Sequence, residues 1–208
     1  MEPGLIWTEG ATTVWQFHLE VSQMVLGELT STLNYFEKAH AESFSNPEFR
    51  SRFVIRRGML RRLLGQQISC DPAKIEFRPS VNGKPTVIGH QIHFSASSSS
   101  DYGLLACSPD HQIGVDIEKH NEVLASPSFE FLTDSESRTV KDATESPEPF
   151  FRIWARKEAC IKATGQGLRY DLRTLDVLAD FVEMPEPVQI WDLPVPEGYS
   201  AALAMVLT

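Results

Sequence analysis

The pattern of apolar and polar residues predicts two similar series of helices and strands. In the first half, Asn46 suits a helix N-cap and Pro47 the first helical position, and apolar residues then recur at helical spacing until Gly65. The other elements predicted there are strands at 12–19, 75–77, 92–94 and 102–107, a polar helix at about 30–44 and a turn at 82–83.

The second half begins with a strand at 113–118, whose apolar residues share one face. Asp116 and Glu118 lie on the opposite face, which we expect to be exposed. Residues 133–136 have the form of a capping box and start a short helix. The remaining predicted elements are the longest helix at about 147–164, ended by Gly165 and Gly167, and strands at 175–178, 188–191 and 200–207.

Each half closes with an aromatic residue followed by small apolar residues, at 102–106 and at 199–204. At 208 residues, the chain has a length between those of one and two typical domains. We therefore expect an α+β fold of two similar subdomains, 1–111 and 112–208, in a pseudo-twofold arrangement. Each subdomain would be a small, mainly antiparallel sheet packed with helices, and the functional site would lie at their interface.

Charge is divided unevenly between the halves. Residues 1–112 contain 10 Lys and Arg against 11 Asp and Glu, and residues 113–208 contain 9 against 17, for a net charge of −9. This balance argues against a nucleic-acid partner. The sequence contains no membrane-length apolar run and no signal-peptide pattern, so we expect a cytoplasmic protein whose three cysteines are buried free thiols.

Asp116 and Glu118 are the first candidates for chemistry. At a Cα spacing of about 6.7 Å and an effective dielectric constant of about 20, two such charges repel by about 2.5 kcal/mol. A pair of hard oxygen donors held this way favours Mg²⁺. The alternative is an ordinary solvated sheet face.

Three further groups are candidates, each with a structural alternative. Glu158 and Lys162 are an i,i+4 pair on the predicted helix, which is also a common surface pair. Lys84 stands at a turn, where it can contact a phosphate. Arg52 and Arg56 share a helix face and can hold an anion, although exposed arginines are usually only solvated.

Taken in order, these motifs resemble the Sfp-like 4'-phosphopantetheinyl transferases. The resemblance is carried by Gly114-Val115-Asp116-x-Glu118 and by Trp154-x-x-Lys157-Glu158-Ala159-x-x-Lys162, together with Arg52, Arg61 and Gly83-Lys84-Pro85. It implies transfer of 4'-phosphopantetheine from coenzyme A to a serine of an acyl or peptidyl carrier protein of fatty-acid, polyketide or non-ribosomal peptide assembly. It also implies coenzyme A in the cleft between two subdomains, with release of 3',5'-adenosine bisphosphate. The internal doubling makes a monomer the expected state.

The resemblance also implies roles for individual residues. Mg²⁺, or Mn²⁺ in its place, would be held by Asp116, Glu118 and Glu158. Catalysis would rest on Glu158 as base, with Lys162 and Asp116. The coenzyme A contacts implied are Arg52, Lys84, Ser95, Ser97, Lys157 and Lys162. Glu136 matches a further acidic position of the family.

The sequence departs from the family on the side that binds the nucleotide. The family commonly has Ser-His-Ser where this chain has Ser95-Ala96-Ser97, and that histidine contacts the 3'-phosphate of coenzyme A. His93 is a possible substitute. A basic pair common in the first helix is also missing, since Glu37 and His40 stand there. We therefore expect weaker or rearranged 3'-phosphate binding.

Two other functions remain open from the sequence. One is a degenerate relative that binds coenzyme A or carrier protein as a scaffold without transfer, and the other is a Mg²⁺-dependent pyrophosphatase. Phe129, Phe131 and Leu132 are candidates for a carrier-docking patch, although core positions are equally compatible with them.

Overall fold

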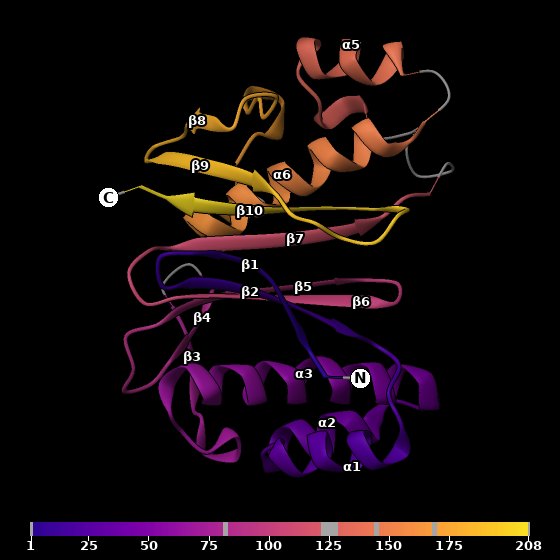
Figure 1. Ribbon diagram of the computed structural model, residues 1–208, viewed down its shortest axis with the longest axis vertical. Helices are drawn as coiled ribbons and strands as arrows, with labels where there is room; N and C mark the ends of the chain where they lie inside the picture. Colours follow the sequence, from indigo (N-terminus) through magenta and orange to yellow (C-terminus); the bar gives the residue numbers. More distant parts are fainter. Residues whose placement is uncertain (1, 81–82, 122–128, 144–145, 168–169, 208) are drawn as a thin grey trace.

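The computed structural model describes residues 2–80, 83–121, 129–143, 146–167 and 170–207. These form four layers, in the order helices, sheet, sheet, helices (Figure 1). The first sheet has the order β1-β2-β6-β5 and the second β7-β10-β9-β8, with antiparallel neighbours throughout. Their strands are β1 (Gly4–Glu9), β2 (Thr12–His18), β5 (His93–Ser99) and β6 (Tyr102–Ser108), then β7 (Ile113–Lys119), β8 (Phe181–Glu183), β9 (Pro187–Asp192) and β10 (Tyr199–Val206).

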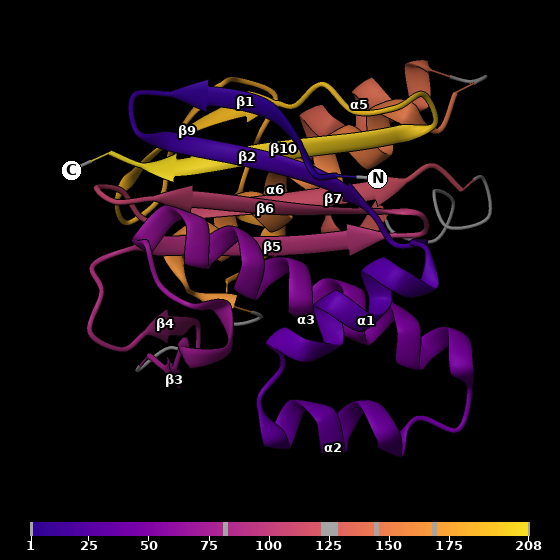
Figure 2. The ribbon, with the colours of Figure 1, turned by 60° about the horizontal axis from the view of Figure 1, so that its bottom comes forward.

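Helices cover the two outer faces. The first sheet is covered by α3 (Pro47–Ile68), with α1 (Gln23–Thr32) and α2 (Tyr35–Ser43) packed against α3, and the second by α6 (Glu148–Thr164), with α5 (Asp134–Asp142) packed against α6 (Figures 1 and 2). Between α3 and β5 lie the short helix η1 (Pro72–Lys74) and a two-stranded sheet of β3 (Phe77–Pro79) and β4 (Pro85–Val87). Two further short helices are η2 (Phe129–Phe131) and η4 (Leu172–Thr174). In the described part of the chain, no helix is both long and apolar enough to cross a membrane.

Alternation along the central strands divides the apolar core into three layers. In β6, Leu105 faces α3 whereas Leu104 faces the second sheet, and in β10, Leu203 faces the first sheet whereas Ala202 faces α6. Both faces of these strands are therefore buried, which explains their nearly continuous apolar sequence. This arrangement confirms the predicted α+β class with antiparallel sheets packed with helices.

Local sequence signals explain most element boundaries. The side chain of Asn46 caps α3, and Gly165 ends α6 in the left-handed conformation, as predicted. The predicted capping box is also present, with Thr133 and Glu136 bonded to each other's backbone. Of the predicted turn at 82–83, Asn82 lies outside the described residues, and Gly83 has a φ of +81°.

Several predicted elements differ from the structure. The single helix expected at 30–44 is two helices, because Asn34 forms a capping box with Glu37 and starts α2. The longest helix is α3, with 22 residues against 17 in α6. No strand forms at 175–178, where Val177 N–H bonds to a side chain instead of a strand partner. The edge strands β1 and β8 were not predicted.

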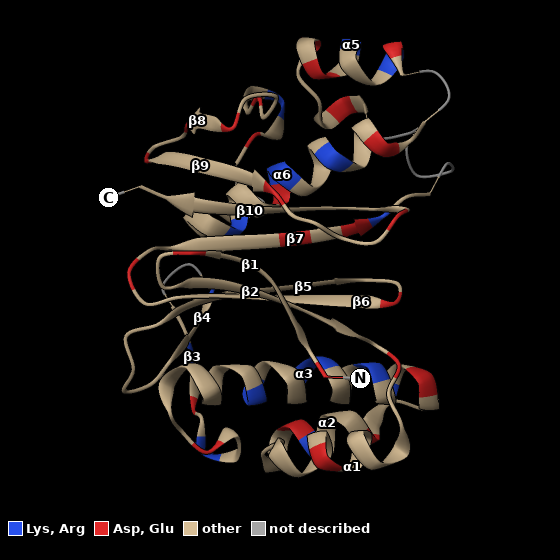
Figure 3. Cartoon of the chain, viewed as in Figure 1, with Lys and Arg blue, Asp and Glu red and all other residues tan. Residues whose placement is uncertain are grey.

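The two sheets share a connectivity. In each, three strands follow the same pattern: β2 and β7 are each followed by a long helix and later by two further strands, the second of which pairs between the other two, giving β2-β6-β5 with α3 and β7-β10-β9 with α6. Charged residues are sparse on the strands, but β7 carries several (Figure 3). The chemistry is therefore concentrated where β7 meets its neighbours.

Candidate active site

Gly114 brings β7 and α6 into direct contact. A Cβ at this position would lie 2.0 Å from the carbonyl oxygen of Ala159 and 2.4 Å from the nitrogen of Ala163, so a larger residue has no room. Because side chains alternate along the strand, Asp116 and Glu118 also project toward α6. The face that we expected to be exposed is covered, and Asp116 is only 3% exposed.

Asp116 is held by one oxygen and leaves the other unsatisfied. Its Oδ1 accepts hydrogen bonds from Lys162 Nζ at 2.6 Å and from Ser97 Oγ at 2.7 Å. Its Oδ2 is buried and has no hydrogen-bond partner in the described structure. Burial raises the pKa of Asp116, and the nearby Lys162 and Ser97 oppose that shift. An unpaired buried carboxylate oxygen is costly, and it marks a place where a cation would be stabilised.

Glu118 lies beside Asp116 and is strongly perturbed. Burial, with the Asp116 charge as the second cause, raises its pKa to about 7. Ser99 Oγ donates a hydrogen bond to Glu118 Oε2 at 3.3 Å, and the Trp154 indole of α6 lies within hydrogen-bonding reach. The two acids therefore remain close enough to repel each other, as their spacing predicts.

Glu158 and Lys162 lie one turn apart on α6, but they do not form the surface ion pair considered above. Lys162 Nζ reaches β7 instead, where it contacts Asp116, Ser97 and, at 3.4 Å, the carbonyl oxygen of Val115. Burial and the Asp116 charge both raise the pKa of Glu158. Glu158 is thus a half-buried carboxyl with increased basicity, close to a second acid.

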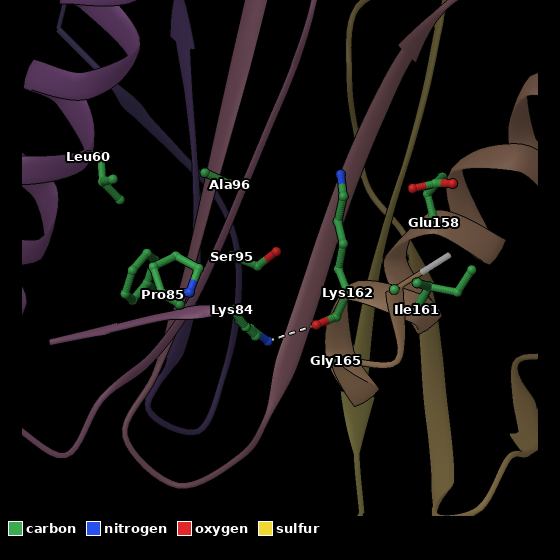
Figure 4. Close-up of a pocket in the computed structure, with 11 residues that line it drawn as sticks. Leu60, Lys84, Pro85, Ser95, Ala96, Glu158, Ile161, Lys162 and Gly165 are labelled. Atoms are coloured by element: carbon green, nitrogen blue, oxygen red, sulfur yellow. Dashed lines mark hydrogen bonds between the residues drawn. The ribbon is translucent and has the colours of Figure 1, made fainter. Parts of the chain in front are cut away.

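Of these residues, Glu158 and Lys162 border a cavity of about 420 Å³ where the two halves of the chain meet (Figure 4). Leu60 and Ala96 line it on the side of the first sheet, and Glu158 and Lys162 line it on the side of α6. The full lining is Leu60, Lys84, Pro85, Phe94, Ser95, Ala96, Glu158, Ile161, Lys162, Gly165 and Gly167. The wall is mostly apolar, with its charges at one side.

Lys84 links the two halves next to this cavity. Its Nζ donates to the carbonyl oxygens of Ile113 at 2.6 Å and Lys162 at 2.8 Å, the second of which is drawn in Figure 4. Burial lowers the pKa of Lys84 to about 8. The predicted phosphate ligand therefore lies at the cavity, where it also satisfies the carbonyl group of a residue in the last turn of α6.

Serine hydroxyls of β5 reach the open edge of β7. Ser95 Oγ accepts from Val115 N–H at 3.0 Å, and Ser99 Oγ accepts from Lys119 N–H at 3.0 Å. No backbone ladder joins these two described strands, which belong to different sheets. Ser99 was not predicted as a site residue, although continuing the alternation of Ser95 and Ser97 by one step would have identified it.

Lys157 lies outside the cavity. Its side chain is 0% exposed and pairs at 2.7 Å with Glu136, which is also 0% exposed. Its remaining hydrogen bonds go to the carbonyl oxygens of Leu172 and Leu175, at 2.7 and 2.6 Å. This placement does not support the predicted contact with coenzyme A, because every donor of the ammonium group is used inside the protein.

Two arginines of the motifs that resemble the family differ in their accessibility to a ligand. Arg61 is fully buried, and its guanidinium group donates to Glu37 and to the carbonyl oxygens of Pro72 and Ile75. Arg52 is partly exposed, pairs with Glu48, and donates to the carbonyl oxygen of Ser100. Arg61 is thus part of the internal packing, whereas Arg52 remains accessible at a distance from the cavity.

The two departures from the family pattern have visible structural settings. Ala96 is exposed and its methyl group forms part of the cavity wall, whereas His93 is not among the lining residues. Burial lowers the pKa of His93, and the charge of Lys84 adds to this shift, so the ring favours its neutral form. Glu37 forms ion pairs with Arg57 and Arg61. It therefore joins α2 to α3, whereas a basic residue at this position would present a positive charge at the surface.

The predicted metal ligands are near one another without forming a complete cation cage. Among the described residues, no group of three or more His, Cys, Asp and Glu side chains is arranged to hold a metal ion. Asp116 and Glu118 are adjacent on β7, and Glu158 approaches Asp116 closely enough to feel its charge. The ammonium group of Lys162 occupies the contact with Asp116 Oδ1.

Comparison with known proteins connects this geometry to a family. Residues 112–191, which include β7 and α6, match the model of the 4'-phosphopantetheinyl transferase superfamily. The chain is 31% identical over 175 residues to the 4'-phosphopantetheinyl transferase HetI of Nostoc sp., covering 80% of this chain and 73% of that protein.

Two further relatives are similar over most of this chain. The 4'-phosphopantetheinyl transferase gsp of Aneurinibacillus migulanus is 25% identical over 88% of this chain and 80% of its own length. The 4'-phosphopantetheinyl transferase Sfp of Bacillus subtilis is 28% identical over 77% of this chain and 76% of its own length. With Glu158 and Lys162 of α6 lining the cavity and Lys162 paired with Asp116 of β7, the chain belongs to the Sfp-like branch of the 4'-phosphopantetheinyl transferase superfamily.

Proposed function

We propose that this protein transfers the 4'-phosphopantetheine group of coenzyme A to a serine hydroxyl of an acyl or peptidyl carrier protein and releases 3',5'-adenosine bisphosphate. Support comes from family membership, since the relatives above are named 4'-phosphopantetheinyl transferases. The observation that carries the proposal is the position of Asp116, Glu158 and Lys162. Buried Asp116 pairs with Lys162, and Lys162 and half-buried Glu158 line a cavity large enough for part of a nucleotide.

A divalent cation, Mg²⁺ or Mn²⁺, fits the acid pair. Asp116 has an unsatisfied buried oxygen, and the pKa of Glu118 is raised partly by the charge of Asp116, so a positive ion between them would relieve both costs. Mg²⁺ is usually bound by one or two carboxylates, with substrate phosphates completing its shell. Asp116 and Glu118 would hold the ion, with Glu158 beside them, and Lys162 would leave Asp116 Oδ1. When bound, the ion would neutralise charge on the diphosphate of coenzyme A.

Glu158 is the proposed general base. A serine hydroxyl is a weak nucleophile at its ordinary pKa, so its proton must be accepted as the oxygen attacks the β-phosphorus. The new O–P bond forms as the bridging P–O bond breaks, and the bridging oxygen leaves with the bisphosphate. The raised pKa of Glu158, caused by burial and by the charge of Asp116, makes this carboxylate a stronger base than an exposed glutamate.

The cations at the cavity are the proposed contacts for the diphosphate. Lys162 lies beside Asp116 with its side chain 30% exposed, so its ammonium group is accessible to a ligand. Lys84 uses two of its three donors on carbonyl oxygens, which leaves one for a phosphate. Ser95 and Ser97 also belong to this group of proposed contacts. Arg52 of α3, which contacts the chain at the far end of β5, is a further proposed contact. Lys157 is not one of these proposed contacts, because its side chain is completely buried.

The organisation of the molecule forms part of the proposal. The shared connectivity of the two sheets supports two subdomains, 1–111 and 112–208, related by a pseudo-twofold axis, with the cavity between them. This doubling within one chain supports a monomer as the active species. Cys70, Cys107 and Cys160 are free thiols, which is compatible with the reducing cytoplasm.

Intact-mass spectrometry of an apo carrier protein tests the reaction. The carrier is incubated with the protein, coenzyme A and Mg²⁺, and a gain of one phosphopantetheine is expected. Glu158→Gln should slow the gain by about 100-fold or more, as for loss of a general base. Glu148→Gln is the matched control, because Glu148 is an exposed acid in the first turn of the same helix.

The competing functions give different results in the same assay. Binding of coenzyme A or carrier without any mass gain by the wild-type protein would indicate a scaffold. Cleavage of coenzyme A without a carrier would indicate a pyrophosphatase. Unchanged transfer by Glu158→Gln would show that the proton is accepted elsewhere.

A further inference from the structure

Serine hydroxyls of β5 contact both acids of β7 at matching positions. Ser97 Oγ donates a hydrogen bond to Asp116 Oδ1 at 2.7 Å, and Ser99 Oγ donates one to Glu118 Oε2 at 3.3 Å. Each strand advances by two residues from the first contact to the second, so the hydrogen bonds repeat with the period of the strands. The first half of the chain therefore contacts both carboxylates of the second half.

The hydroxyl of Ser99 is itself oriented by the backbone of β7. Its oxygen accepts a hydrogen bond from Lys119 N–H at 3.0 Å. A serine hydroxyl has a single proton, and because its oxygen is held by Lys119, this proton is directed toward Glu118. One side chain thus joins two consecutive residues of β7, and the carboxylate of Glu118 has a donor at a fixed position.

The hairpin that carries Ser99 is anchored to both halves of the chain. Its tip is formed by Ser100 and Asp101, and Ser100 has a φ of +48°, which is uncommon for a residue other than glycine. From the first half, Arg52 donates to the carbonyl oxygen of Ser100. From the second half, Tyr199 Oη donates to Asp101 Oδ2 at 3.1 Å. Ser99 therefore precedes a tip whose position is set by contacts from both sides.

Glu118 requires such support because its neighbour has the same charge. Asp116 and Glu118 project from one face of β7, and their repulsion favours rotation of the half-buried Glu118 side chain away from Asp116. Ser99 opposes this rotation from β5, and the indole of Trp154 opposes it from α6. A carboxylate has lone pairs for about four hydrogen bonds, so these two donors leave it able to bind a cation.

We propose that Ser99 is a positioning residue for divalent-cation binding, which acts by holding the Glu118 carboxylate beside Asp116. Groups that hydrogen-bond to metal ligands fix the orientation of those ligands, and their loss commonly lowers metal affinity by about 10–100-fold. The inference rests on the proposed function, because it takes Glu118 as a cation ligand. It adds that the cation site depends on both halves of the chain.

Binding of Mn²⁺ in the absence of coenzyme A and carrier tests this role without turnover. Electron paramagnetic resonance measures free Mn²⁺, and Ser99→Ala should weaken binding by about tenfold. Ser98→Ala is the matched control and should bind as wild type, because Ser98 is the neighbouring serine of β5 and its Oγ lies 3.5 Å from Arg56 Nη1 instead of at an acid. Urea unfolding of both variants checks that they retain the fold.

A double-variant cycle separates positioning of Glu118 from a general effect on β7. Glu118→Ala removes the group through which Ser99 acts, so Ser99→Ala should cause no further loss of Mn²⁺ affinity in that background. A loss of about tenfold in both backgrounds would show that Ser99 acts through the backbone of Lys119, and it would overturn the proposal. In the transfer assay, Ser99→Ala should raise the Mg²⁺ concentration for half-maximal rate by about tenfold, with KM for coenzyme A at saturating Mg²⁺ within about twofold of wild type.

The outcomes also distinguish this inference from the proposed function. Unchanged Mn²⁺ affinity in Ser99→Ala, or no Mn²⁺ binding by the wild-type protein, would overturn the positioning role even if the protein modifies a carrier. A loss of affinity that depends on Glu118 would support it even if no carrier is modified, in which case only the transfer reaction would be rejected.

Discussion

Gly114→Ala should displace α6 without altering any polar group. The added Cβ would lie 2.0 Å from Ala159 O, 2.4 Å from Ala163 N and 2.8 Å from Lys162 Cβ. Two of these atoms are backbone atoms of α6, so the helix must retreat by at least about 1 Å to reach ordinary contact. Overpacking of this kind costs about 1–3 kcal/mol of stability.

The same displacement of α6 should lower the rate of transfer by more than the loss of stability alone would. Glu158 and Lys162 move with α6, whereas Asp116 stays on β7, and a misplacement of about 1 Å costs about 100-fold in rate. The assay is kcat/KM for carrier modification together with urea unfolding. Gly27→Ala in α1 is the control, since a Cβ there meets nothing within 4 Å, and it should be neutral or slightly stabilising. The close-contact argument would be refuted if Gly114→Ala kept kcat/KM within twofold of wild type and its free energy of unfolding within about 0.5 kcal/mol of wild type.

Three other substitutions test the electrostatics of the site. Because the pKa of Glu118 is raised from 4.5 to about 7, the folded state binds more protons than the unfolded state between these two pH values. The stability of the wild-type protein therefore falls as pH rises through that window. Glu118→Gln should gain stability relative to wild type at pH 8 but not at pH 4, measured by urea unfolding without metal. Lys157→Met leaves Glu136 buried without a counter-charge and should lower the free energy of unfolding by about 3–5 kcal/mol. The double variant with Glu136→Gln should lose less stability than Lys157→Met alone, and equal losses would contradict a coupled pair. Asp116→Asn should abolish transfer and weaken Mn²⁺ binding, followed by electron paramagnetic resonance, while retaining the fold, and full Mn²⁺ affinity would reject this residue as a ligand.

Much of the fold was predictable because the relevant signals are local. The strand at 113–118 shows strict alternation, and Asn46, Thr133 and Gly165 mark helix boundaries by short-range hydrogen bonds or backbone conformation. The break at Asn34 escaped prediction because the polar residues of 30–44 are compatible with one long helix, and only the reciprocal bonds between Asn34 and Glu37 start a new one.

The site was less predictable, because its details depend on how distant segments pack. Sequence spacing places Asp116 and Glu118 on one strand face, but it does not tell whether that face is covered; the contact of α6 with Gly114 covers it. Lys157 and Lys162 have the same charge and lie on one helix, yet one is buried against Glu136 and the other reaches Asp116. These differences arise from tertiary contacts that the chain pattern does not encode locally.

The open edge of β7 has a consequence for solubility. An exposed strand edge is a template for pairing with another molecule, and proteins commonly protect such edges. Here Lys84, Ser95 and Ser99 bond to the outward-facing backbone groups of this strand. These three side chains therefore also block intermolecular strand addition, and variants lacking several of them should aggregate more readily even where each single change is harmless.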